Sequence, residues 1–169
     1  MLLLLAFLCV LSCNEKLTDN PIGNQPPKTF LWLFPDSTIG VSTSRQRIRW
    51  WGEDPDGVVK GYLFAFKIVT SNVTSVPTPD TLRYTWVTRN DTTLLFPLDT
   101  LFRKFVVVVR GVDNAFRLLP EHSIVRLAPI SYWDKDDNGV FSGNDEQLPD
   151  LAGAMDPAGA VLTFPIRNS

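Results

Sequence analysis

"KFVVVVRGV", residues 104–112, is the stretch that decides the fold. Phe and four consecutive Val residues favour extended backbone, because aromatic and β-branched side chains pack well on a pleated surface. The stretch therefore predicts the strongest strand of the chain. The chain of 169 residues is 44% hydrophobic, enough for one good core, so a single domain is expected.

Similar segments lie on both sides of this strand and are separated by turn signals. The tetrapeptide "DPDG", residues 54–57, suits a type I turn, because Pro presets φ and Gly accepts the exit geometry. In the segment after this turn, Tyr62, Phe64, Phe66 and Ile68 share one face by strand alternation. The pattern predicts an all-β, seven-stranded antiparallel sandwich. The seven segments are 29–34, 45–51, 58–69, 82–88, 92–98, 104–112 and 122–130.

Two of these regions carry a resemblance to a known family. "IRWWGEDPDGVVKGYLFAFK" and, further on, "LDTLFRKFVVVVRGVDNAF" resemble the fibronectin type III pattern over residues 29–130. The resemblance implies that Trp50 is the core tryptophan, that Tyr62 or Phe64 is the aromatic of the third strand, and that Leu98 and Phe105 form the corner pair. Phe stands at 105 where the family has Tyr, so the usual corner hydrogen bond is absent. "DPDG" before "GY" is similar to fibronectin-like domains in envelope lipoproteins of Bacteroidetes-related bacteria.

The N-terminal segment predicts export and membrane anchoring. "MLLLLAFLCVLSC", residues 1–13, has the length of a signal-peptide core and is too short to span a bilayer. Its end resembles the bacterial lipoprotein lipobox, which implies that Cys13 carries the lipid anchor. The alternative is a free or disulfide-bonded Cys13, with Cys9 as its partner. Residues 14–28 are rich in Asn, Pro and Gly and predict a flexible tether. Asn14 after the cysteine favours the outer membrane.

An acidic stretch late in the chain is the candidate metal site. In "DKDDNGVFSGNDE", residues 134–146, acidic and polar residues fall at the positions of a calcium loop. Alternate residues of a tight turn converge on one point, and Ca²⁺ takes six to eight oxygen ligands. The loop resembles the lone calcium loops of dockerin or thrombospondin type 3 repeats. The alternative is a solvated polar turn without metal. The candidate ligands are Asp134, Asp136, Asn138, the Val140 carbonyl, Ser142 and Asp145.

A second candidate site is a strip of basic and aromatic residues. Arg45, Arg47, Arg49 and Trp51 share parity, opposite the inward Ile48 and Trp50. Arginine beside an aromatic ring can bind an acidic glycan or a partner strand through charge and stacking. The alternative is an ordinary outward sheet face covered by long side chains.

Composition and the remaining motifs argue against catalysis and against nucleic-acid binding. The net charge of −2 provides no concentrated positive field for phosphates. His122, the only histidine, has no nucleophile marked for it, and no phosphate loop, zinc motif or serine elbow is present.

Residues 131–169 are expected to form a C-terminal loop excursion and an extra terminal strand, which leads into a further domain if the chain is the N-terminal module of a longer lipoprotein. The predicted function is a non-catalytic envelope lipoprotein module for binding or spacing, stiffened by calcium if the acidic loop is filled. The alternative is a glycan-binding accessory module or a fragment of a polysaccharide-processing enzyme.

Overall fold

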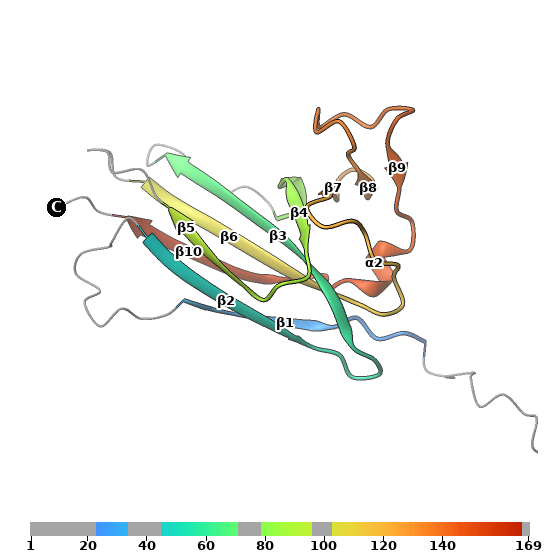
Figure 1. The fold of residues 1–169 in the computed structure, drawn as a ribbon, viewed down its shortest axis with the longest axis horizontal. Coiled ribbons are helices and arrows are strands. Elements are labelled where there is room, and N and C mark those ends of the chain that lie inside the picture. Colours follow the sequence, from blue (N-terminus) through green and yellow to red (C-terminus); the bar gives the residue numbers. More distant parts are fainter. Residues whose placement is uncertain (1–22, 34–44, 71–78, 96–102, 167–169) are drawn as a thin grey trace, which may run out of the picture.

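The computed structural model describes residues 23–33, 45–70, 79–95 and 103–166. These residues form two antiparallel sheets (Figure 1). The three-stranded sheet has the order β1-β2-β5, and the seven-stranded sheet has the order β10-β6-β3-β4-β7-β8-β9. The strands are β1 (Lys28–Leu33), β2 (Arg45–Glu53), β3 (Val59–Thr70), β4 (Tyr84–Val87), β5 (Asp91–Leu95), β6 (Arg103–Asp113), β7 (Ile124–Arg126), β8 (Tyr132–Trp133), β9 (Glu146–Gln147) and β10 (Ala160–Ile166). The helical turns are η2 (Pro79–Thr81) and α2 (Leu151–Ala154).

The predicted all-β sandwich is confirmed, and the strand pattern is richer than expected. Each of the seven predicted segments contains a strand, and two short strands, β8 and β9, were not predicted. The segment 122–130 is strand only over Ile124–Arg126. Pro129, which has no N–H for a sheet hydrogen bond, lies just beyond that strand.

The two sheets enclose a core in which β2 faces β3 and β6. Ile48 and Trp50 of β2 are fully buried and pack with Val107 and Val109 of β6. The ring of Trp50 is stacked on Phe64 at 5.3 Å between centroids and meets Tyr62 edge-on at 6.2 Å. The tryptophan and the third-strand aromatics singled out in the sequence therefore lie together between the sheets.

The other face of the large sheet is also buried. Leu63 of β3 and Val106 and Val108 of β6 belong to a second apolar cluster. This cluster is completed from residues 114–159 by Leu119, Leu148, Leu151 and Met155, among others. In Figure 1, β7, β8, β9 and α2 gather beyond β4, away from β1 and β2. The unbroken Val run of β6 is thus explained, because a strand that is covered on both faces has apolar residues without alternation.

The last strand returns to the sandwich. β10 pairs with β6 along its whole length, from Ala160 opposite Val109 to Ile166 opposite Arg103. Residues 114–159 therefore form an insertion layer between two strands that are neighbours in the sheet. The carboxylate of Asp156 fixes the return, since it accepts hydrogen bonds from the backbone N–H groups of Thr29, Ala158 and Gly159.

Candidate functional site

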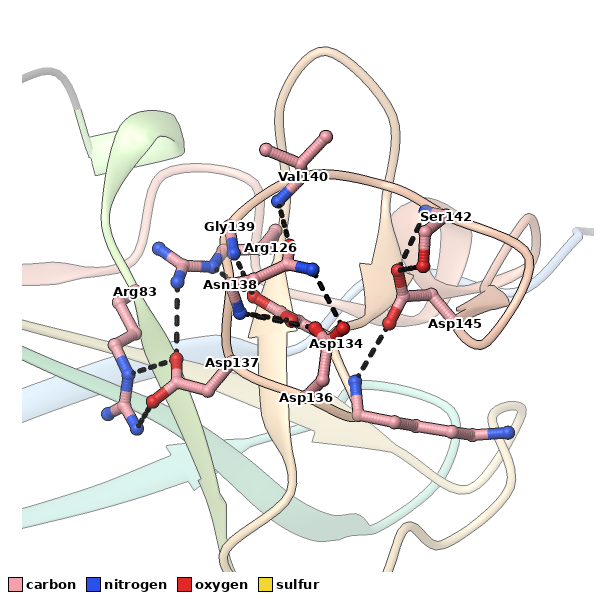
Figure 2. Close-up of polar contacts among 11 residues, drawn as sticks. Arg83, Arg126, Asp134, Asp136, Asp137, Asn138, Gly139, Val140, Ser142 and Asp145 are labelled. Carbon is pink, nitrogen blue, oxygen red and sulfur yellow. Dashed lines mark hydrogen bonds and ion pairs between the residues drawn. The ribbon is translucent and has the colours of Figure 1, made fainter.

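The acidic stretch is the connection between β8 and β9. Trp133 pairs with Glu146 and Tyr132 pairs with Gln147, so residues 134–145 form the loop of a hairpin. Asp134 and Asp145 directly follow and precede the last paired residues. The sheet therefore brings the two ends of the loop together, and the intervening residues turn back toward them (Figure 2).

Three carboxylates of the loop converge. Asp134, Asp136 and Asp145 each place an oxygen within 4.8 Å of the other two, an arrangement that can hold a metal ion. Ca²⁺ binds oxygens at about 2.3–2.6 Å, so two ligands of one ion stand at most about 5 Å apart. Asp134 is 1% exposed, whereas Asp136 lies at the surface. The spacing of the three groups is compatible with one shared metal ion.

Asp134 is held by the loop backbone and by an arginine from the neighbouring strand. Its carboxylate accepts hydrogen bonds from the backbone N–H groups of Asn138, at 3.1 Å, and Gly139, at 3.0 Å. Arg126 of β7 donates its Nε–H to the same group at 2.9 Å. Gly139 has φ of +77°, a conformation that glycine adopts without a steric penalty, so the loop can bend sharply there.

Asp145 is oriented by the other half of the loop. It accepts hydrogen bonds from the backbone N–H of Lys135 at 2.9 Å and from the N–H and hydroxyl of Ser142 at 2.7 and 3.0 Å. Partial burial acts to raise the pKa of Asp145, but these hydrogen bonds prevail and lower its pKa below the ordinary value. The Asp145 side chain is therefore held as a carboxylate, the form that binds cations.

The remaining acidic side chains of the stretch turn toward arginines. Asp137 forms hydrogen bonds with Arg83 at 2.7 and 2.6 Å and an ion pair with Arg126 at 3.2 Å. The hydrogen bond from Arg83 lowers the pKa of Asp137. Glu146 pairs with Arg117 and, at 3.4 Å, with Lys135. Asp137 and Glu146 thus point to cationic partners outside the cluster, whereas Asp134, Asp136 and Asp145 converge on one another, with Arg126 also donating to Asp134.

The other candidate ligands lie on the same loop. The side-chain oxygen of Asn138 accepts a hydrogen bond from the Val140 N–H at 2.6 Å, and its amide donates to Asp136 at 2.7 Å. Ser142 contacts Asp145, as described above. Sequence reasoning missed Arg83, which directly precedes β4, and Arg126, which is the last residue of β7. No local signal marks them, because only the tertiary fold brings them to the loop.

The basic and aromatic strip lies on the outer face of the three-stranded sheet. Arg47, Arg49 and Trp51 are exposed, while Ile48 and Trp50 point into the core. The Arg45 side chain lies outside the described part, as does Cys13. Phe30 of β1 stacks on Trp51 with 5.2 Å between ring centroids. The alternation of "TFLWLF" was the signal that could have placed Phe30 and Trp32 on this face.

Comparisons with known proteins returned no match. No family model matches the chain, and neither a curated protein nor a solved structure matches it. Among the described residues, no helix is both long and apolar enough to cross a membrane.

Proposed function

We propose that this chain is a non-catalytic module of the bacterial outer membrane that is anchored by lipid at Cys13 and stiffened by calcium in the loop 134–146. The fibronectin type III-like assignment is supported by the strand order. Strands β1, β2 and β5 form one sheet, while β3, β6 and β10 adjoin in the other. This corresponds to the division of immunoglobulin-like sandwiches into one sheet with strands A, B and E and another with C, F and G.

The convergence of three carboxylates is the observation that carries the calcium proposal. Like charges at this separation repel one another, and a divalent cation removes that repulsion. A carboxylate has about four acceptor sites. The described hydrogen bonds use three on Asp134, two on Asp136 and three on Asp145, which leaves each group capacity for an ion. Extracellular sites of this kind bind calcium at roughly 10⁻⁴ to 10⁻³ M.

The role of the ion is structural. A filled loop fixes the β8–β9 hairpin, which in turn holds the outer layer of the second core against β3 and β6. This stiffening suits a module that displays or spaces other parts of an envelope protein.

Calorimetry with CaCl₂ and thermal melting in calcium or chelator test the proposal. At a calcium concentration about 20-fold above Kd, binding stabilises the folded state by about 1.8 kcal/mol. For a chain of this size we expect Tm to rise by about 4–7 °C. No heat of binding and equal melting temperatures in calcium and chelator would show that the loop is a polar turn without metal.

Two isosteric variants in one loop give a matched comparison. Asp136→Asn removes a converging carboxylate, and Asp137→Asn removes one that faces Arg83. We expect Asp136→Asn to weaken calcium binding at least about tenfold, because calcium affinity depends on the number of charged ligands. Asp137→Asn should bind nearly as well as the wild type. Equal losses in both variants would indicate a diffuse charge effect instead of a site.

A further inference from the structure

A second surface, on the opposite side of the sandwich from the calcium loop, has features that the fold does not require. The outer face of the three-stranded sheet carries Phe30 and Trp32 on β1 beside Trp51 and Arg49 on β2, which the register places opposite each other in pairs. Trp32 is 56% exposed and Trp51 is 42% exposed. None of these three aromatic residues belongs to a buried core cluster. Two exposed indoles and the Phe30 ring thus lie on one short sheet, and contiguous exposed apolar patches are typical of interaction surfaces.

The aromatic residues are ordered by their neighbours. Phe30 lies between the Trp51 ring on one side, at an interplanar angle of 15°, and the ammonium of Lys28, which is 5.3 Å from its centroid. The Trp51 ring is therefore supported by Phe30 instead of moving freely. A ring that is already positioned loses little conformational entropy when a ligand packs against it.

Basic groups surround this aromatic strip. Arg47 forms hydrogen bonds with Asp91 of β5, through Nε at 3.1 Å and through its terminal nitrogen. The hydrogen bond from Arg47 is the main cause that lowers the pKa of Asp91, and the charges of Arg47, Arg49 and Arg89 also contribute. Three guanidinium groups thus act on one carboxylate, and the register places Lys28 opposite Glu53. Lys28, Arg47, Arg49 and Arg89 outnumber the carboxylates of Glu53 and Asp91 near the strip, and such an excess of positive charge favours an anion.

The area of this outer face limits the size of the ligand that it can bind. Three strands about 4.8 Å apart, with outward residues over about 20 Å of strand, offer on the order of 300 Å². Stable protein interfaces bury about 800 Å² on each partner. A sugar chain needs less area, because the C–H groups on the face of a pyranose ring pack on an indole, while guanidinium groups bind carboxylate or phosphate through paired hydrogen bonds.

We propose that the outer face of β1-β2-β5 binds an anionic polysaccharide, with Trp51 and Trp32 as stacking platforms and Arg47 and Arg49 as the anion-binding groups. This goes beyond the calcium proposal and is independent of it, because the two sites lie on different sheets. Carboxylate-bearing and phosphate-bearing polysaccharides share the required chemistry.

Calorimetry on the full chain tests the proposal with three probes, namely polygalacturonate oligomers, a phosphate-bearing mannan and a neutral galactan. We expect at least one anionic probe to bind, binding to weaken as salt rises from about 50 to about 500 mM, and the neutral probe to bind at least about tenfold more weakly. Repeating the titration in chelator should leave the affinity for the polysaccharide unchanged. The result therefore does not depend on whether the loop 134–146 binds calcium.

Variants complete the test. Trp51→Ala should weaken binding about tenfold or more, and Arg49→Gln should reduce the preference for anionic over neutral probes. Phe141→Ala, which removes an exposed aromatic from the acidic loop, is the control and should bind as the wild type does. The proposal is overturned if neither anionic probe binds, if the neutral probe binds equally, or if Trp51→Ala has no effect. Sedimentation showing self-association that Trp51→Ala abolishes would assign the face to a second copy of the chain.

Discussion

The two sides of the large sheet are stabilised by different interactions. Toward β1-β2-β5, the core consists of aromatic and aliphatic contacts around Trp50, Phe64 and Val107. On the opposite face, apolar residues also pack on the sheet, but the loop above them is fixed by ion pairs and by hydrogen bonds to Asp134 and Asp145. Apolar packing responds little to pH or ions, whereas a charged loop responds to both. We therefore expect the core around Trp50 to respond less to pH and to ions than the loop that contains Asp134 and Asp145 does.

Two adjacent tryptophans of β2 should differ most in their contribution to stability. Trp50 is 1% exposed and Trp51 is 42% exposed. Trp50→Ala should lower the free energy of unfolding by about 4 kcal/mol, through lost apolar burial and the cavity that remains. Trp51→Ala should change it by less than about 1 kcal/mol. Urea unfolding of both variants measures the difference, and comparable losses would mean that Trp50 is not the centre of this core.

A substitution in the insertion layer, residues 114–159, tests whether the apolar clusters on the two faces of the large sheet unfold together. Leu151 of α2 is fully buried in the cluster on the far face. Leu151→Ala should cost about 3 kcal/mol. Because both cores share β3 and β6, we expect one cooperative transition at a lower urea midpoint. Circular dichroism and tryptophan fluorescence that report separate transitions would show that the layer folds on its own.

Arg126, the partner of Asp134, tests whether the stability of the loop depends on calcium. Arg126 donates to this buried carboxylate, and its own side chain is 21% exposed. Arg126→Gln should destabilise the protein by about 2 kcal/mol in chelator, since a buried charge loses its partner. In calcium the loss should be smaller, because the ion compensates the same carboxylate. A loss of equal size in both conditions would contradict a calcium ion at Asp134.

The smallest expected effect is on acid stability. Because its pKa is lowered in the folded state, Asp137 stabilises the protein above its ordinary value of 3.8, and this contribution is lost as pH falls through the folded-state pKa. Thermal melting of the wild type from pH 6 to about pH 3 should therefore decline more steeply than that of Asp137→Asn. The variant Asp91→Asn offers the same test on the aromatic side, where Arg47 lowers the pKa. Parallel curves would mean that these ion pairs are too exposed to matter.

The fold was largely predictable because its strands are local patterns. The alternation in β2 and β3 correctly placed Trp50, Phe64 and their neighbours inward, and the run 104–112 is the body of β6, which lies between β10 and β3 in the large sheet. The position of β10 was not predictable, because nothing in residues 160–166 indicates which strand they pair with. Strands β8 and β9 have two residues each, too few to form a pattern.

The candidate metal loop was predictable in part for the same reason. Its spacing, with Gly139 at the bend, is local, and the convergence of Asp134, Asp136 and Asp145 follows from it. Asp137 pairs with Arg83 and does not join the three converging carboxylates. This could not be predicted locally, because Arg83 lies 54 positions away in the sequence. Likewise, Phe30 meets Trp51 only through the β1–β2 register.

The direction of β10 determines how far apart the chain enters and leaves the sandwich. Lys28, Glu53 and Asp113 mark one end of the long strands, and Arg103 and Ile166 mark the other. The chain therefore enters at one pole and leaves at the opposite one, about 35 Å away for a strand of this length. If Cys13 carries the proposed lipid, the length of the strands sets how far the exit point of β10 lies from the membrane-proximal entry point of β1.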